Sequence, residues 1–264
     1  MKRVFPSAFF LFFTTYHILV ITTFFFTSNN VNAQVLNPQQ LATALLKATK
    51  NGENYTQLLT EVAQCPKETL LTNLSTENQR KAFWLNIYNA ITQIALLENP
   101  TSYQKKAKFF KKKYLIAQTR LSLDNIEHDI LRHSKIKLSL GYLNKPFVRR
   151  KIKQFRLAEV DFRIHFALNC GAESCPPIAF YTPENIENQL DKATQNYLNQ
   201  QCQYDKEKQI IYLPKLMQWF KADFGGKKGI YHILRNEALI PLLSQPEIKY
   251  LPYNWTLAPL LFEE

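Results

Sequence analysis

The sequence has no cysteine before Cys65 and no formal charge between Val4 and Phe26. Because a lipoprotein signal needs a cysteine to carry its lipid, the first absence excludes that route of export. The second absence leaves an apolar run, rich in Phe, Leu, Ile and Val, that follows Lys2 and Arg3. A positive start followed by an apolar run is typical of a secretory signal.

The end of this run carries a cleavage signal. In Val31-Asn32-Ala33 the first and third side chains are small, which suits cutting before Gln34. We therefore expect residues 1–33 to be a signal peptide and the mature protein to be periplasmic or secreted. The alternative is an uncleaved membrane anchor, because the uncharged run is long enough to span a bilayer, although its threonines thin its hydrophobicity.

Acidic residues are scarce: the chain has 33 Lys and Arg against 21 Asp and Glu. Loss of Lys2 and Arg3 with the signal lowers the net charge only from +12 to +10. In an exported protein this charge favours anionic envelope surfaces over nucleic acid as a partner. No repeat or low-complexity tract divides residues 34–264, so we expect one domain.

Periodicity and turn residues predict a mixture of helices and a few strands. The predicted helices cover residues 39–50, 55–63, 78–98, 122–133, 183–200, 214–222 and 230–239. The predicted strands cover residues 162–169, 209–213 and 248–255. This mixture favours an α+β fold, a single mixed domain with a buried central helix and a small sheet.

The helix over 78–98 is apolar almost all round, so it belongs in the core. Its inner polar residues, Asn86, Asn89 and Gln93, fall on one narrow stripe. Such amides either hydrogen-bond a neighbouring loop or orient a catalytic base and donate to an oxyanion. Both interpretations remain open.

Two further segments carry titratable residues. In the helix over 122–133, Glu127 lies within the apolar stripe and His128 at its edge, so Glu127 needs a partner. In the strand over 162–169, strict alternation places Arg163, His165 and Asn169 on one face. His165 should then point away from Cys170.

Basic residues concentrate in two stretches, residues 105–113 and 145–156. Most charge runs are solvated faces. The alternative is contact with acidic lipid or polysaccharide, with Phe109 and Phe110 entering the interface.

The mature chain has four cysteines, Cys65, Cys170, Cys175 and Cys202, and sequence alone leaves three complete pairings open. In an oxidising compartment, disulfides are the default. A zinc site is disfavoured because Cys-x4-Cys has no matching second pair. We expect no cofactor.

A catalytic interpretation makes Cys170 a nucleophile, with the backbone N–H groups of Gly171 and Ala172 serving an oxyanion. His128, oriented by Glu127, or else His165 would be the base. Asn86 would assist as a further catalytic residue.

Three long blocks resemble the domain of unknown function 547 family: Lys81 to Ala90, Leu121 to His128, and Arg163 to Pro177. Shorter matches include Trp219-Phe220, Asp223-Phe224-Gly225 and Tyr250 to Trp255. The resemblance implies exported bacterial proteins and plant relatives, and a distant similarity to papain-like and transglutaminase-like cysteine hydrolases, in which the order of parts differs because Cys170 follows His128. Within these blocks we expect ligand-binding roles for Tyr88, Asn89, Arg163 and Asn169.

Two hypotheses follow. The first is an envelope cysteine hydrolase or acyltransferase that acts on an amide, ester or peptide bond. The second is a non-catalytic envelope module that binds a peptide, a glycan or an anionic lipid. A hydrogen bond between His128 and Cys170 would favour the enzyme, and a Cys170–Cys175 bridge would favour the module.

Overall fold

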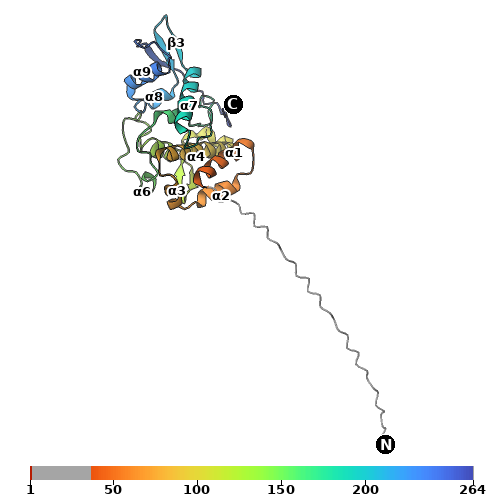
Figure 1. Cartoon of the computed structure of the whole chain (residues 1–264). Helices are drawn as coiled ribbons and strands as arrows, with labels where there is room; N and C mark the ends of the chain where they lie inside the picture. The colour runs from red at the N-terminus through yellow and green to blue at the C-terminus, as the bar shows by residue number, and fades with distance from the viewer. Residues whose placement is uncertain (2–36, 264) are drawn as a thin grey trace. The chain divides into compact units, whose positions relative to one another are not determined.

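The cap that starts the first helix, α1 (Pro38–Asn51), follows from three residues. The Asn37 side chain accepts from the Gln40 backbone N–H, and the Gln40 side chain accepts from the Asn37 N–H. Pro38 needs no donor partner at the first helical position. The computed structural model describes residues 37–263 together with Met1 (Figure 1), so the expected signal peptide after Met1 and its cleavage site lie outside the described residues.

The central helix α4 (Glu77–Glu98) confirms the predicted core helix, and every residue from Lys81 to Leu96 is buried. It packs against α1, α7 (Ile186–Gln201) and η2 (Asn125–Leu131). The short helices α2 (Thr56–Gln64) and α3 (Lys67–Asn73) complete this half of the core. Since α4 touches most layers of this half, it fixes the positions of the loops around it.

A second hydrophobic cluster forms around a small sheet at the other end of the domain, where β3, α8 and α9 lie in Figure 1. Strands β3 (Gln203–Asp205) and β4 (Ile210–Leu213) pair antiparallel, and β4 pairs parallel with β5 (Glu247–Tyr250). Helices α8 (Leu216–Trp219) and α9 (Gly226–Asn236) cover it. The mixture confirms the predicted α+β class.

Between the two clusters the chain forms short elements. A two-stranded hairpin pairs β1 (Lys113–Ile116) with β2 (Thr119–Ser122). It follows η1 (Pro100–Lys105) and α5 (Lys106–Lys111), and α6 (Arg150–Lys153) lies further along. In the part of the chain that the structure describes, no helix combines the length and apolar character needed to cross a bilayer.

Four predicted elements differ from the structure. The strand over 162–169 is instead a 3-10 helix, η3 (Phe162–Phe166), because the Asp161 side chain caps it by accepting from the Arg163 N–H. The final strand stops at Tyr250, shortly before Pro252, which has no N–H to donate to a ladder. The helix over 214–222 keeps only α8, and α9 begins at Gly226, earlier than predicted.

Phe109 and Phe110 are buried, so the expectation that they enter an interface is wrong. The Phe109 ring packs edge-on against Tyr103 and Phe110. Their apolar surface is already removed from water, and only the lysines of α5 remain outside.

Candidate functional site

A cavity of about 120 Å³ lies where η2, η3 and the segments around residues 170, 219 and 254 meet. This volume equals about four water molecules at ~30 Å³ each. Six aromatic residues form most of the wall: Tyr88, Phe110, Trp219, Phe220, Tyr253 and Trp255. The polar part of the wall consists of Glu127, His128, Lys137, His165 and Cys170. An apolar cavity with a few converging polar groups is the usual form of a ligand or active site.

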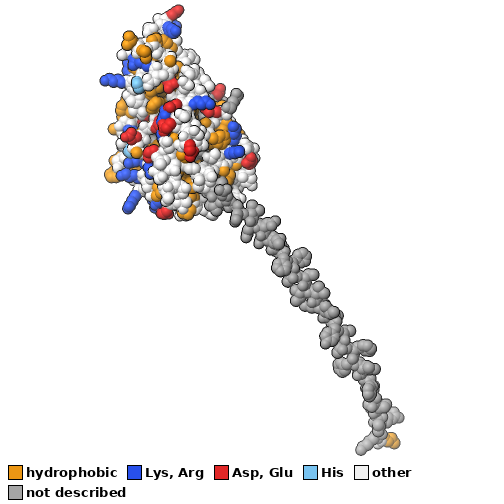
Figure 2. All heavy atoms as spheres, viewed as in Figure 1, with side chains coloured by type: hydrophobic (Ala, Val, Ile, Leu, Met, Phe, Trp, Pro, Cys, Tyr) orange, Lys and Arg blue, Asp and Glu red, His pale blue; other side chains and the backbone are white. Residues whose placement is uncertain are grey.

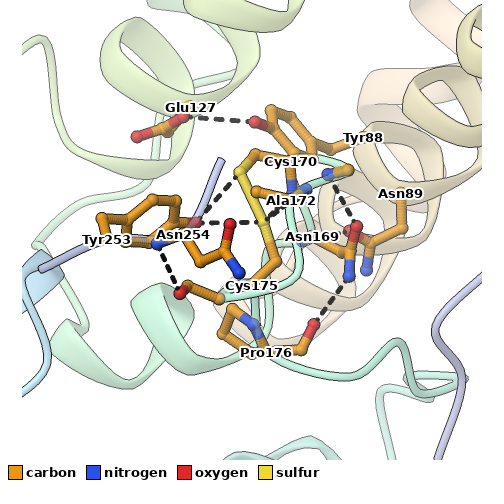
Figure 3. Close-up of a disulfide and its surroundings, with 12 residues drawn as sticks. Tyr88, Asn89, Glu127, Asn169, Cys170, Ala172, Cys175, Pro176, Tyr253 and Asn254 are labelled. Atoms are coloured by element: carbon orange, nitrogen blue, oxygen red, sulfur yellow. Dashed lines mark hydrogen bonds between the residues drawn. A yellow bond between two sulfur atoms is a disulfide. The ribbon is translucent and has the colours of Figure 1, made fainter. Parts of the chain in front are cut away.

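Glu127 and His128 come from η2, which is a π-helix rather than the α-helix that the pattern predicted. The wider turn is visible in the bond from the Arg132 N–H to the Glu127 carbonyl, which spans five residues. This turn places the Glu127 side chain beside Tyr88, whose hydroxyl donates to Oε2 at 3.3 Å (Figure 3).

Burial raises the pKa of the Glu127 carboxyl, although Arg132 and Lys137 act in the opposite direction. The carboxyl therefore takes up a proton more readily than an exposed glutamate does. The sequence predicted that Glu127 needs a partner, and Tyr88 is that partner.

His128 is buried and accepts a hydrogen bond from its own helix. Arg132 Nη1 lies 2.9 Å from Nδ1, and an arginine can only donate, so Nδ1 accepts and the ring proton resides on Nε2. Burial holds the pKa of His128 well below its usual range, and the Arg132 charge lowers it further. Among the described residues no hydrogen bond joins His128 to Cys170, so the nitrogen that a base would use is occupied.

Asp223 joins Arg132 to His165 in a buried ion network. Arg132 Nε lies 2.6 Å from Asp223 Oδ2, and His165 Nε2 lies 2.8 Å from the same oxygen. The Arg132 and Asp223 side chains are fully buried. Burial alone would raise the pKa of the Asp223 carboxyl, but hydrogen bonds and charge from His165 and Arg132 lower it.

His165 lines the cavity, contrary to the expectation that it points away from Cys170. In the 3-10 turn of η3, residues no longer alternate between two faces, and the imidazole stacks on Phe220 with ring centroids 4.1 Å apart. Burial lowers the pKa of His165, while the hydrogen bond to Asp223 opposes that shift. Nε2 thus faces Asp223.

Cys170 and Cys175 form a disulfide on the cavity wall (Figure 3). The Cys170 and Ala172 N–H groups donate to the Cys175 sulfur at 3.0 and 3.3 Å, and the Tyr253 hydroxyl contacts both sulfurs at 3.2 and 3.1 Å. The Gly171 N–H donates to Asn169 Oδ1 at 2.8 Å. Both N–H groups that were expected to serve an oxyanion are therefore already bonded.

The other two cysteines, Cys65 and Cys202, are free thiols. Burial raises the pKa of both, that of Cys202 to about 12. Neither is an activated nucleophile, since the thiolate is the reactive form.

The polar stripe of α4 holds loops in place rather than lining the cavity. Asn86 bonds both the carbonyl and the N–H of Tyr181, at 2.8 and 3.0 Å. Asn89 bonds the Ala167 carbonyl at 3.0 Å and the Asn169 N–H at 2.9 Å. The catalytic role predicted for Asn86 and the binding role predicted for Asn89 gain no support from these positions.

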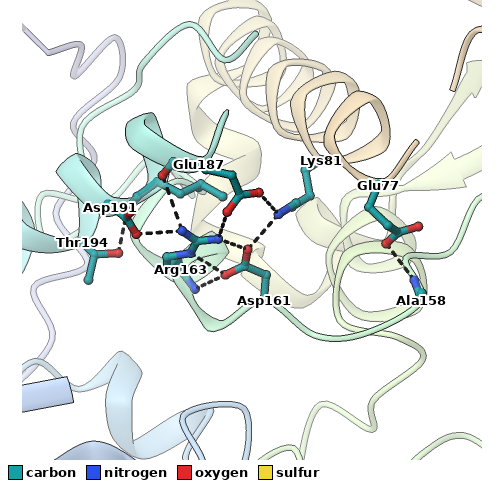
Figure 4. Close-up of polar contacts among 9 residues, drawn as sticks. Glu77, Lys81, Ala158, Asp161, Arg163, Glu187, Asp191 and Thr194 are labelled. Atoms are coloured by element: carbon teal, nitrogen blue, oxygen red, sulfur yellow. Dashed lines mark hydrogen bonds and ion pairs between the residues drawn. The ribbon is translucent and has the colours of Figure 1, made fainter. Parts of the chain in front are cut away.

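Two other predicted binding residues also lie away from the cavity wall. Asn169 is fully buried and donates to the Pro176 carbonyl at 2.8 Å. Arg163 belongs to a separate ion network, in which it contacts Asp161, Glu187 and Asp191, while Lys81 joins Asp161 to Glu187 (Figure 4). This network ties η3 to α4 and α7. Of the four predicted binding residues, only Tyr88 lines the cavity.

The residues that sequence reasoning missed are Arg132, Asp223 and the aromatic cluster of Trp219, Tyr253 and Trp255. Asp223 and the three aromatic residues lie in the short blocks that resemble the family, although their composition alone assigned them no role. Arg132 lies one turn beyond Glu127, and a buried arginine cannot be distinguished from an exposed one by its sequence position.

Neither curated proteins nor solved structures gave a match to this chain. Residues 71–198 match the model of a family described as "Protein of unknown function, DUF547". The matched stretch contains α4, η2, η3 and the disulfide, whereas Asp223 and Tyr253 follow it. The chain belongs to this family of proteins of unknown function, DUF547.

Proposed function

We propose that the chain is exported and that its domain is a non-catalytic envelope module, which binds a small neutral group of a glycan or peptide in the cavity. One observation carries this proposal: the sulfur of Cys170, the obvious nucleophile, is bonded to Cys175. The engaged Nδ1 of His128 and the engaged N–H groups at 171 and 172 agree with it.

The aromatic cluster supports a sugar or peptide as the ligand. The Tyr253 ring centroid lies 4.9 Å from that of Trp219 and 4.6 Å from that of Trp255. Trp255 remains 38% exposed, so its ring is open to a ligand from solvent. Large aromatic faces stack on sugar rings and peptide groups at a small entropic cost.

The polar groups favour a neutral ligand over an ionic one. Glu127 and the Tyr88 hydroxyl offer hydrogen bonds, and the raised pKa of Glu127 favours its uncharged form. The cavity accommodates only a few non-hydrogen atoms, which suits an acetamido group or a short side chain. The rest of the ligand would lie across Trp255.

The test is a titration that follows tryptophan fluorescence. The two probes are the N-acetylglucosamine dimer and N-acetyl-alanylalanine amide, the neutral groups of cell-wall sugar and peptide chains. We expect one of them to bind, and Trp219→Ala to weaken it at least tenfold. Phe147→Ala, which removes an exposed ring outside the cavity wall, is the control. Absence of binding by both probes contradicts the proposal.

A second candidate is a cysteine hydrolase or acyltransferase that works after the disulfide is reduced. The observation that favours it is that Cys170 and His165 line one cavity while Asp223 holds His165 Nε2. In this mechanism the Cys170 thiolate attacks a carbonyl carbon and the C–N or C–O bond breaks. His165 gives a proton to the leaving group, and water or an amine then cleaves the thioester.

Alkylation by iodoacetamide, read by mass spectrometry, separates the two candidates. If the enzyme exists, Cys170 is alkylated only after treatment with a phosphine reductant, faster than Cys65, and His165→Ala slows the reaction. If Cys170 stays unreactive after reduction, the enzyme candidate fails. The binding proposal is not affected by that result, because it depends on the oxidised form.

A further inference from the structure

The segment that connects η2 to α6 exposes large apolar side chains. Leu138 is 92% exposed and Phe147 94%, with Tyr142 and Leu143 at 58% and 60%. Burying such side chains stabilises a soluble protein, so several of them standing exposed in one short segment indicate a surface that another phase covers.

This segment has an ordered backbone. The Ile136 N–H donates to the Leu143 carbonyl and the Lys145 N–H to the Ser134 carbonyl, both at 2.8 Å. The Leu140 carbonyl accepts from the Ala222 N–H at 2.9 Å, which fastens the loop to the domain. The apolar side chains are therefore presented by a fixed loop, and little ordering is needed on binding.

Basic residues surround these side chains. Residues 134–158 contain eight Lys and Arg and no Asp or Glu. Arg149, Arg150, Lys151 and Lys153 are exposed and form no ion pair within the described residues. Near the place of α6, Figure 2 shows blue basic side chains beside orange apolar ones at the edge of the domain.

The earlier basic stretch meets this one in space. Burial lowers the pKa of Lys113, and the charges of Arg149 and Lys145 add to that shift, so the three cations lie close together. Two carboxylates offset part of the charge, since Lys137 pairs with Asp124 and Lys145 with Asp129. The remaining cations form an uncompensated positive surface.

We propose that residues 137–153 dock the domain on an anionic lipid bilayer, with Leu138, Leu143 and Phe147 entering the interface. Arg149, Arg150 and Lys151 contact the headgroup phosphates. Apolar side chains that project from a ring of cations suit the boundary between acyl chains and phosphates, where both kinds of group are satisfied. This surface differs from the one expected from sequence, because the buried Phe109 and Phe110 take no part.

Vesicle co-sedimentation tests the proposal with the chain as it is isolated after export. Vesicles of phosphatidylcholine with about one third phosphatidylglycerol are compared with phosphatidylcholine alone, at low salt and at high salt. We expect binding to the anionic vesicles only, with a loss of at least tenfold at high salt. The double variants Leu138→Ser with Phe147→Ser and Arg150→Glu with Lys151→Glu should each weaken it at least tenfold.

The matched controls are Leu242→Ser with Leu243→Ser, and Lys192→Glu with Lys206→Glu, which alter exposed residues elsewhere. Circular dichroism verifies that every variant folds. If the controls weaken binding as much as the loop variants, the surface is wrongly placed. If the chain binds an anionic cell-wall polysaccharide but neither kind of vesicle, or binds both kinds equally, the lipid proposal is overturned.

Discussion

His165 Nε2 lies 2.8 Å from an Asp223 oxygen, although 58 positions separate the two residues in the chain. Because the carboxylate only accepts, Nε2 carries a proton and the ring orientation is fixed. Arg132 donates to the same carboxylate and to His128, so one aspartate organises both histidines of the cavity.

Replacement of Asp223 by Asn should destabilise the domain strongly. The Arg132 side chain would be left buried without a counter-charge, which costs about 3–5 kcal/mol. Urea unfolding measures this loss. Asp205→Asn, in an ion pair with the exposed Lys208, is the control and should cost less than about 1 kcal/mol. Equal effects of the two changes would contradict the importance of the buried network.

Glycine at 141 is required by two separate features. Its φ is +86°, and a Cβ added there would lie 2.3 Å from Asp223 Oδ1. Gly141→Ala should therefore cost about 3 kcal/mol through backbone strain and overlap. Gly52→Ala is the matched control, because its φ is +68° with no atom within 4 Å, and strain alone costs about 1 kcal/mol. The difference between their urea midpoints is the measurement.

Glu127→Gln should stabilise the domain in a pH-dependent way. The pKa of Glu127 is raised in the fold, so the native state keeps a proton that the unfolded state loses, and stability falls as pH rises above ~4.5. Glutamine removes this penalty, and its advantage should grow from pH 4 to 8. Urea unfolding across that range shows the trend. Glu159→Gln, at an exposed position, should give a flat difference.

The disulfide should stabilise the domain by a modest amount. It closes a short loop, since Cys170 and Cys175 are five positions apart, and the chain-entropy relation gives about 2 kcal/mol. Cys175→Ser should lose that stability and become insensitive to reductant. Wild-type protein should fall to the same level when reduced, whereas Cys65→Ser should behave as wild type. A variant that still responds to reductant would indicate a different pairing.

Local signals predicted the helices well. The Asn37 cap and the unbroken apolar helix around Trp84 depend on residues close in sequence, and both are present. The segment at Phe162 was misjudged because its aromatic and branched residues suit a strand, while one side chain, that of Asp161, caps a 3-10 turn instead. A single hydrogen bond decided between two structures of similar propensity.

The site was predicted in part. Cys170, His165, Glu127, His128 and Tyr88 were named from sequence and all line the cavity. Their partners were not, because Arg132 and Asp223 lie 91 positions apart and no periodicity reports such a contact. The reciprocal bonds of Asn86 and Asn89 likewise depend on loops that approach α4 from distant segments.

The glycine at 141 also makes the exposed loop and the buried ions a single mechanical unit. Any ligand or surface that pulls on this loop pulls against the oxygen of Asp223 that lies beneath it. Pressure on the outside of the domain thus reaches the imidazole of His165 through one missing methyl group, and loop engineering at this position would alter the cavity before it altered the surface.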